Sequence, residues 1–147
     1  MLQQRLSVIT LGVADIEASR RFYTDVLGWK TDDRENCIFF DLGGYALALY
    51  EVGKLAEDIS LTITPPERRG FNGFTLAYNV GSAEEVDQLF RKLAAHNVDI
   101  LKPPQAVFWG GYSGYFADVD GHPWEIAFNP FVTIDAAGRM RMDKPSN

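Results

Sequence analysis

The spacing of apolar residues predicts that the first half of the chain folds in the order β-α-β-β-β. Residues 7–13 (SVITLGV) are rich in β-branched side chains and predict a strand. A helix follows, because Asp15 is a typical N-cap, apolar residues recur at helical spacing and Gly28 can end it. The pattern then predicts three further strands, at residues 29–31, 37–42 and 45–52.

The second half repeats this order. Residues 74–80 (FTLAYNV) predict a strand, and Ser82 with Glu85 three positions later has the spacing of a capping box for a second helix. Asn97 is a plausible residue to end that helix. Three strands are then expected at residues 98–101, 115–117 and 124–128, with a bend at Pro103 and Pro104 before the last two and a turn at 118–121 between them.

The two halves can be aligned residue by residue. Residues 8–13 lie over 75–80 at an offset of 67, and residues 41–44 and 47–49 lie over 118–121 and 124–126 at an offset of 77. This internal repeat divides the chain into a module at 1–53, a connector at 54–73, a second module at 74–130, and a C-terminal hairpin and tail at 131–147. In the connector, Pro65 and Pro66 exclude a regular core element, and residues 59–63 are expected at most as a short edge strand.

Composition narrows the classes of partner. The chain has 147 residues, 46% of them hydrophobic, and a formal net charge of −6, so nucleic acid and anionic membrane surfaces are poor partners. Cys37 is the single cysteine, so an internal disulfide cannot form. Neither a signal peptide nor an apolar run long enough to span a bilayer is recognisable, and the expected location is cytoplasmic.

The last predicted strand carries the main candidate for chemistry. Because strand side chains alternate, Glu125 points away from its large apolar neighbours Trp124, Ile126 and Phe128. A single carboxylate on that face is suited to bind a metal, to contact a ligand or to lie at an ordinary surface. The functional question of the sequence is which of these applies.

Two segments resemble one known family. The stretches LGVADIEASRRFYTDVLGW and DVDGHPWEIAF are similar to the vicinal oxygen chelate superfamily, which includes glyoxalase I, extradiol dioxygenases, and fosfomycin and bleomycin resistance proteins. The resemblance covers residues 7–130. It implies an α+β fold in which two βαβββ modules in tandem form a cup of curved sheets, and it implies a homodimer.

Metal-dependent members of this superfamily usually hold an ion with four ligands, in the order His, Glu, His, Glu. The resemblance places these ligands at Val8, Ala48, Thr75 and Glu125, of which only Glu125 is a competent ligand. We therefore expect neither a metal nor another cofactor. The two histidines do not replace the missing ligands: His96 ends the second helix, and His122, in a turn beside proline, is expected to face solvent.

The resemblance also implies which residues would contact a ligand. Alternation places small and apolar side chains beside Glu125 on the cup face. The aromatic residues around Gly110 and Gly111 are expected either to overhang its mouth on a loop free to close, or to pack between the modules or against a second subunit. Phe39, Tyr45 and Tyr115 are expected in the core or an interface. The predicted ligand-binding residues are Thr10, Ala48, Tyr50, Thr75, Phe108, Trp109, Tyr112 and Glu125.

Three hypotheses remain open at this point. The first is a metal-free binding protein that holds a small, partly aromatic and cationic molecule by stacking and by pairing with Glu125. The second is an isomerase or lyase in which Glu125 is the catalytic general base, assisted by backbone N–H groups of Gly110 or Gly111 or by Tyr50. In the third, the cup is filled by its own side chains and the protein acts through its surface or as a dimer.

Overall fold

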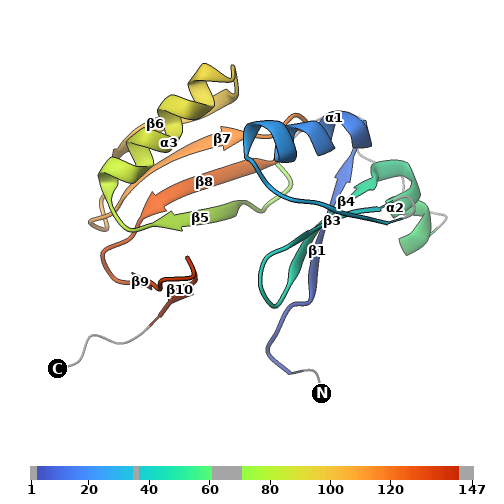
Figure 1. Ribbon diagram of the computed structural model, residues 1–147, viewed down its shortest axis with the longest axis horizontal. Coiled ribbons are helices and arrows are strands. Elements are labelled where there is room, and N and C mark those ends of the chain that lie inside the picture. The colour runs from blue at the N-terminus through green and yellow to red at the C-terminus, as the bar shows by residue number, and fades with distance from the viewer. Residues whose placement is uncertain (1–2, 35–36, 61–70, 143–147) are drawn as a thin grey trace. The chain divides into compact units, whose positions relative to one another are not determined.

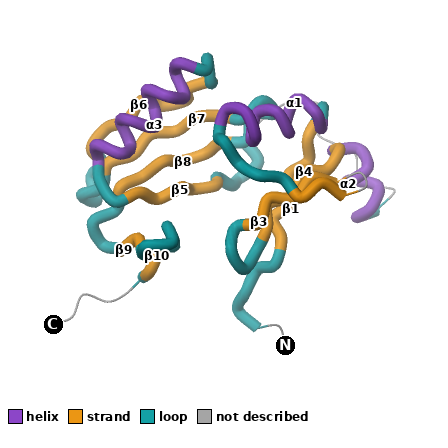
Figure 2. Tube along the Cα trace, in the orientation of Figure 1, coloured by secondary structure: helices purple, strands orange, loops and turns teal. Residues whose placement is uncertain are grey.

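The computed structural model describes residues 3–34, 37–60 and 71–142, and the chain divides into two compact units, Met1–Gly70 and Phe71–Asn147. Each unit contains a four-stranded sheet with a helix on one face, as Figure 1 shows for the ribbon and Figure 2 for the trace. The predicted α+β class is confirmed. Among the described residues, no helix combines the length and the apolar character needed to cross a membrane.

The N-terminal unit has a mixed sheet in the order β1-β4-β3-β2, in which β1 and β4 are parallel. Asp15 caps the first helix as predicted, through its Oδ1 and the backbone N–H groups of Glu17 and Ala18. The helix continues into a π-helical turn, η1, and Gly28 follows with a φ of 73°. The elements are β1 (Val8–Val13), α1 (Ile16–Arg21), η1 (Phe22–Val26), β2 (Asp32–Arg34), β3 (Cys37–Asp41), β4 (Ala46–Glu51) and α2 (Val52–Ile59).

Two predictions for this unit need correction. The second strand begins at Asp32, because Trp29 instead packs its half-buried ring against Tyr23 and Phe40, with centroids 5.6 Å from each. The start of the expected connector is helical, since the Glu51 carboxylate accepts hydrogen bonds from the N–H groups of Gly53 and Lys54 and caps α2. Residue 59 ends this helix, and residues 61–70 lie outside the described residues.

The C-terminal unit has the sheet order β5-β8-β7-β6, with β5 and β8 parallel. Ser82 caps the helix through its hydroxyl and the N–H of Glu85, and Asn97 ends the segment with a φ of 55°, both as predicted. The elements are β5 (Leu76–Val80), α3 (Ala83–Ala95), β6 (Asp99–Ala106), β7 (Tyr112–Ala117), β8 (Pro123–Phe128), β9 (Thr133–Ile134) and β10 (Met140–Arg141).

Proline does not interrupt the strand that follows α3. Residues 103 and 104 were expected to form a bend, but β6 runs through them with two shifts of register against β7. The reason is that β6 is an edge strand, where a missing backbone N–H leaves no gap in the ladder.

The predicted terminal hairpin is present as β9 and β10. Asp135 organises its turn: hydrogen bonds from the backbone N–H of Arg139 and Ala137, together with the Arg139 guanidinium, lower the pKa of this carboxyl to about 2. The expected fraying of residues 143–147 lies outside the described residues.

Strand pairing supports the internal repeat. Thr10 pairs with Ala48, and Ala77 pairs with Glu125, at the offsets of 67 and 77 read from the sequence. The third strands of the two sheets, β3 and β7, align at an offset of 76 residues instead, because Phe39 lies opposite Ala48 and Tyr115 lies opposite Glu125. Residues 42–45 connect β3 to β4, whereas residues 118–122 connect β7 to β8, and this longer turn accounts for the difference of one.

Each sheet packs most of its large apolar side chains on one face. In the N-terminal unit the core face meets η1, where the rings of Tyr23 and Phe40 lie 5.3 Å apart. In the C-terminal unit it meets α3, and Phe116 stacks on Trp124 beneath it, with ring centroids 6.2 Å apart. The opposite face of each sheet carries the residues at which the sequence placed its candidate site.

Candidate functional site

The centre of the candidate site is one cross-strand pair on the C-terminal sheet. Glu125 of β8 lies directly opposite Tyr115 of β7, and both side chains are half-buried. Burial raises the pKa of the Tyr115 hydroxyl above its ordinary value, and the charge of the Glu125 carboxylate and a hydrogen bond to it raise it further. The pair therefore presents a carboxylate beside a hydroxyl that stays protonated at neutral pH.

This pair faces away from α3. The ring of Phe90 in α3 lies over Gly114, where a Cβ atom would come within 2.7 Å of the ring. The Tyr112 hydroxyl donates a 2.9 Å hydrogen bond to Asp87 on the same helix. Because side chains alternate along β7, Gly114 and Tyr112 point toward the helix, and Tyr115 and its partner Glu125 point to the other side.

The neighbours of the pair on β5, on β8 and in the next row of β7 are small. Ala77 on β5 lies directly opposite Glu125, and Ala127 and Ser113 form the next paired row, both almost fully buried. At that end of the face, the Asn79 amide donates to the Met140 sulfur at 3.3 Å, so the terminal hairpin covers it. This face thus holds the Glu125 carboxylate and the Tyr115 hydroxyl, and the pairing of β6 with β7 places Lys102 opposite Tyr115 and Gln105 opposite Ser113.

Of the predicted ligand-binding residues, Thr75 lies one row from Glu125, and its hydroxyl donates to the carbonyl oxygen of Pro123 at 2.9 Å. Tyr112 is not brought to this face, because it is bonded to Asp87. That bond, burial and the charge of Asp87 raise the pKa of the Tyr112 hydroxyl. Tyr112 pairs with Phe128, three residues along β8 from Glu125, so the β6–β7 loop begins about 10 Å along the strand from the backbone of Glu125.

The aromatic loop between β6 and β7 is a closed turn. Hydrogen bonds of 3.0 Å join the N–H of Val107 to the carbonyl of Gly111, and the N–H of Gly110 to the carbonyl of Val107. The Trp109 ring packs directly on Gly111, in space that a side chain there would fill. Phe108 is fully exposed. Gly111 therefore seats the Trp109 ring and Gly110 takes a φ of 94°, whereas the sequence suggested that both glycines give the loop freedom.

The three predicted residues of the N-terminal unit share one face of its sheet. Thr10 pairs with Ala48, and Gly12 in the next row pairs with Tyr50. A Cβ atom at Gly12 would lie 3.0 Å from Val52 in α2, so this helix covers that end of the face. Ala48 is almost fully buried and Thr10 is exposed. The chain's own helix thus fills part of the face.

The residues at the expected metal positions do not fit a divalent ion. Val8 and Ala48 carry no donor atoms, and the Thr75 hydroxyl is bonded to Pro123. Within the described residues, one group of three potential ligands occurs, Asp118, Asp120 and His122, and it lies in the β7–β8 turn. Glu125 does not belong to that group, so a metal site at Glu125 lacks the ligands it would need.

The β7–β8 turn is organised by a buried carboxylate. Asp118 accepts hydrogen bonds from the backbone N–H groups of Asp120 and His122, each at 2.9 Å, and its second oxygen lies 2.9 Å from His122 Nδ1. The His122 side chain is only 11% exposed, so the expectation that it faces solvent is wrong. The histidine stabilises the turn that sets the register of Glu125.

Cys37 is half-buried at the start of β3, and burial raises the pKa of its thiol. A raised pKa keeps the thiol protonated at neutral pH and opposes a role as nucleophile.

Tyr115 is the site residue that the sequence did not identify. With the turn placed at residues 118–121, strand pairing does not bring Tyr115 opposite Glu125, whereas the five-residue turn at 118–122 does. A change of one residue in register moves every side chain to the other face. The signal that could have revealed it was His122, whose bond to Asp118 extends the turn by one residue.

The fold and this face define an α+β protein built from repeated βαβββ units. Residues 5–126 match the family described as the Glyoxalase/Bleomycin resistance protein/Dioxygenase superfamily, and the chain belongs to that family. It is therefore a member of the superfamily that the sequence motifs resemble. Homodimer formation, which the resemblance implies, stays a prediction.

Relatives and solved structures agree with this assignment. The chain is 30% identical over 124 residues to a metallothiol transferase FosB of Staphylococcus saprophyticus, covering 84% of this chain and 76% of the relative. It is 31% identical over 127 residues to that of Lysinibacillus sphaericus, covering 86% and 83%. A glyoxalase-related enzyme from Fulvimarina pelagi shares 41% identity at a TM-score of 0.83, covering 95% of this chain and 98% of that one.

Proposed function

We propose that this protein binds a small, partly aromatic molecule with a cationic group, without a metal, on the sheet face that carries Glu125 and Tyr115. The observation that carries the proposal is the direct pairing of these two residues on the face turned away from α3. A half-buried carboxylate is stabilised by an opposite charge that replaces lost hydration, and the ligand would supply it. The short side chains of Ala77 and Ala127 leave room for such a molecule.

The names of the relatives suggest a different chemistry. A metallothiol transferase depends on a bound metal, and this chain has Val8 and Thr75 where the family resemblance places two histidine ligands. The Thr75 hydroxyl is bonded to a backbone carbonyl, and neither position supplies a good ligand. We therefore do not extend the metal-dependent activity of these relatives to this protein.

The Glu125–Tyr115 pair also favours a second candidate, an isomerase or lyase. In that case Glu125 would accept a proton from a carbon next to a carbonyl group, and the Tyr115 hydroxyl would donate a hydrogen bond to the oxygen that becomes negative. The raised pKa of Tyr115 supports this role, because the hydroxyl keeps its proton across neutral pH. Tyr115 supplies the electrophilic group that the sequence interpretation sought at Gly110, Gly111 or Tyr50.

The test is a calorimetric titration of chelator-treated protein with a panel of aromatic amines. We expect saturable binding, weakened about tenfold or more by Glu125→Gln and less by Tyr115→Phe, because a charge-assisted contact exceeds a neutral one. Glu57→Gln, on the exposed surface of α2, is the matched control and should leave binding unchanged. Binding that requires a stoichiometric divalent metal, or that survives Glu125→Gln, would contradict the proposal.

A measurement of turnover distinguishes the binding protein from the isomerase or lyase. If a bound compound is converted, the enzyme hypothesis requires that Glu125→Gln abolish the conversion and that Tyr115→Phe lower kcat more than it raises KM. A compound that binds with the expected Glu125 dependence and is recovered unchanged supports the binding protein.

A further inference from the structure

The terminal hairpin, β9 and β10, is joined to the C-terminal sheet through a methionine. The side-chain amide of Asn79 in β5 donates to the Met140 sulfur of β10 at 3.3 Å. Figure 1 shows the hairpin beside β5. Asn79 pairs with Ala127, two residues along from the pair of Ala77 with Glu125, so both pairs lie on the same face. The hairpin therefore covers the row next to Glu125.

The turn of the hairpin is held by polar contacts of its own. The Asp135 carboxylate accepts from the N–H groups of Ala137 and Arg139 at 2.9 Å, and the guanidinium groups of Arg139 and Arg141 bond to its second oxygen. Each strand has two residues, and an isolated two-stranded hairpin is marginally stable in water. The order of the hairpin therefore depends on its contact with the sheet.

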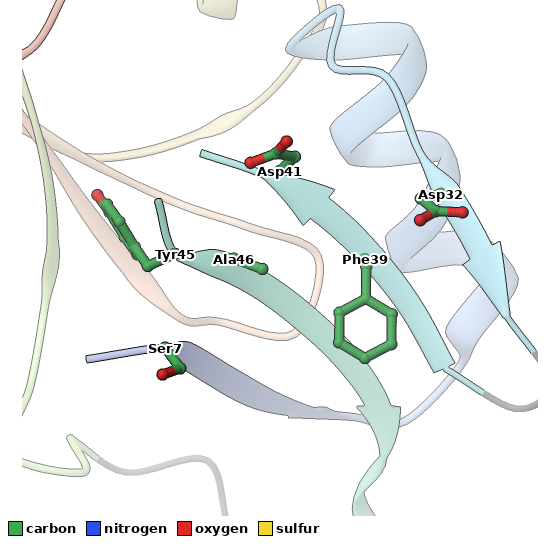
Figure 3. A pocket seen from close by; sticks show the side chains of 6 residues that line it. All are labelled: Ser7, Asp32, Phe39, Asp41, Tyr45 and Ala46. Carbon is green, nitrogen blue, oxygen red and sulfur yellow. The ribbon is translucent and has the colours of Figure 1, made fainter. Parts of the chain in front are cut away.

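The N-terminal unit shows what a cover of this kind leaves open. Helix α2 covers the Gly12 end of the equivalent face through Val52. The pocket shown in Figure 3 lies toward the other end of that face, where Ser7 precedes β1 and Ala46 begins β4. Of these two described covers, the hairpin is the one joined to its sheet through an atom that can be oxidised, the Met140 sulfur.

The Met140 side chain is accessible to oxidants, since the residue is 45% exposed. Peroxides convert a methionine thioether to a sulfoxide. One lone pair of the sulfur forms the new S–O bond, the O–O bond of hydrogen peroxide breaks, and the second oxygen leaves as water. The sulfur is oxidised by two electrons and the peroxide is reduced by two. An apolar side chain thereby becomes polar and larger.

We propose that Met140 is a modification site, at which oxidation by a peroxide releases the terminal hairpin from the sheet. The new S–O bond uses a lone pair of the sulfur that accepts from Asn79, and the added oxygen needs space between β10 and β5. Hydration of the polar sulfoxide favours a position in water over one against the sheet. Release would uncover the row of Asn79 and Ala127, beside Glu125.

The test is treatment of the full chain with hydrogen peroxide, followed by tandem mass spectrometry of its peptides and by NMR measurement of amide exchange. Met140→Leu keeps apolar bulk and cannot form a sulfoxide. Met142→Leu is the matched control, because Met142 lies beyond β10 and is 79% exposed. Met140→Gln places a polar group at this position without oxidant. The reporter is the N–H of Asp135, which donates to the Arg139 carbonyl at 2.9 Å.

We expect sulfoxide at Met140 and Met142, and exchange of the Asp135 amide at least about tenfold faster once Met140 is oxidised. Met142→Leu should keep this response, and Met140→Leu should abolish it. Met140→Gln should show the faster exchange before any peroxide is added. A methionine sulfoxide reductase with a dithiol, which becomes a disulfide as the oxygen leaves as water, should restore slow exchange.

Three results would overturn the proposal: Met140 stays unoxidised while Met142 reacts, oxidised Met140 leaves exchange unchanged, or Met140→Leu responds to peroxide as the native chain does. The last result would assign the response to another group, because Met140→Leu retains Cys37 and Met142. None of these readouts requires the ligand proposed above, so a failure here leaves the proposed function standing.

Discussion

The two sheets place different chemistry at equivalent positions. In the N-terminal unit, Phe39 lies opposite Ala48, whereas in the C-terminal unit the corresponding pair is Tyr115 opposite Glu125. The strand order is the same in both sheets. Both units therefore keep the same strand arrangement. The Glu125 carboxylate corresponds to the Ala48 methyl group, and the Tyr115 ring with its hydroxyl corresponds to the plain ring of Phe39.

The sheet face that carries Ala48 in one unit and Glu125 in the other is covered at one end in both units, but by different segments. Gly12 is covered by Val52 of α2, the helix that follows the last strand of its sheet. Asn79, at the equivalent position 67 residues later, is bonded to Met140 of the terminal hairpin, which also follows the last strand. A segment after the fourth strand thus covers the same row in each unit, and Thr10 and Ala77 in the adjacent rows are exposed.

On the core face, the two sheets fill one equivalent position from different elements. Ile38 of β3 lies opposite Leu49, and its counterpart Gly114 of β7 lies opposite Ile126. The N-terminal unit fills this position from the sheet with isoleucine. The C-terminal unit fills it from α3 with the Phe90 ring. Equivalent positions therefore differ in side-chain size because the helices above them differ.

The largest effect is expected from Gly114→Ala. A Cβ atom there would lie 2.7 Å from Phe90 Cζ and 2.9 Å from both the Lys102 carbonyl oxygen and the Pro104 nitrogen, so backbone as well as side chain must move. We expect a loss of about 3 kcal/mol in the free energy of unfolding, measured by urea denaturation. Gly81→Ala, which would meet only the Glu85 carboxylate at 3.2 Å, is the control and should change stability by less than about 0.5 kcal/mol. Equal unfolding midpoints for the two variants would refute this account of the core.

The sequence predicted the frame of the molecule better than its details. Alternation along β8 correctly separated Glu125 from Trp124 and Ile126, because burial of one face leaves little choice of register. It could not place Tyr115, since that depends on a turn lengthened by the contact between Asp118 and His122. Helix α2 was missed because Glu51 both ends β4 and caps the helix through its side chain, which accepts from the N–H groups of Gly53 and Lys54. These failures concern contacts between side chain and backbone that a hydrophobic pattern does not encode.

The β7–β8 turn provides the second prediction. Asp118→Ala removes a fully buried carboxylate and leaves His122 and two backbone N–H groups without their acceptor, so we expect a loss of about 2 kcal/mol in unfolding free energy. Asp41→Ala in the N-terminal unit removes one exposed hydrogen bond to Gly43 and should cost less than about 1 kcal/mol. Both variants are measured by urea denaturation. Similar losses would show that the two turns do not differ as the burial of their aspartates implies.

The smallest predicted effect is a difference between the N-caps of α2 and α3 in their response to pH. Hydrogen bonds from the N–H groups of Gly53 and Lys54 hold the pKa of Glu51 below its ordinary 4.5, whereas the Ser82 cap of α3 does not titrate. A lowered folded-state pKa means that the cap stabilises α2 fully above about pH 4.5 and loses this contribution as the pH falls through the folded-state pKa. Amide exchange in α2 should therefore accelerate on acidification relative to α3, after correction for intrinsic rates. Glu51→Gln should abolish this difference, and a pH response that persists in the variant would assign it to another group.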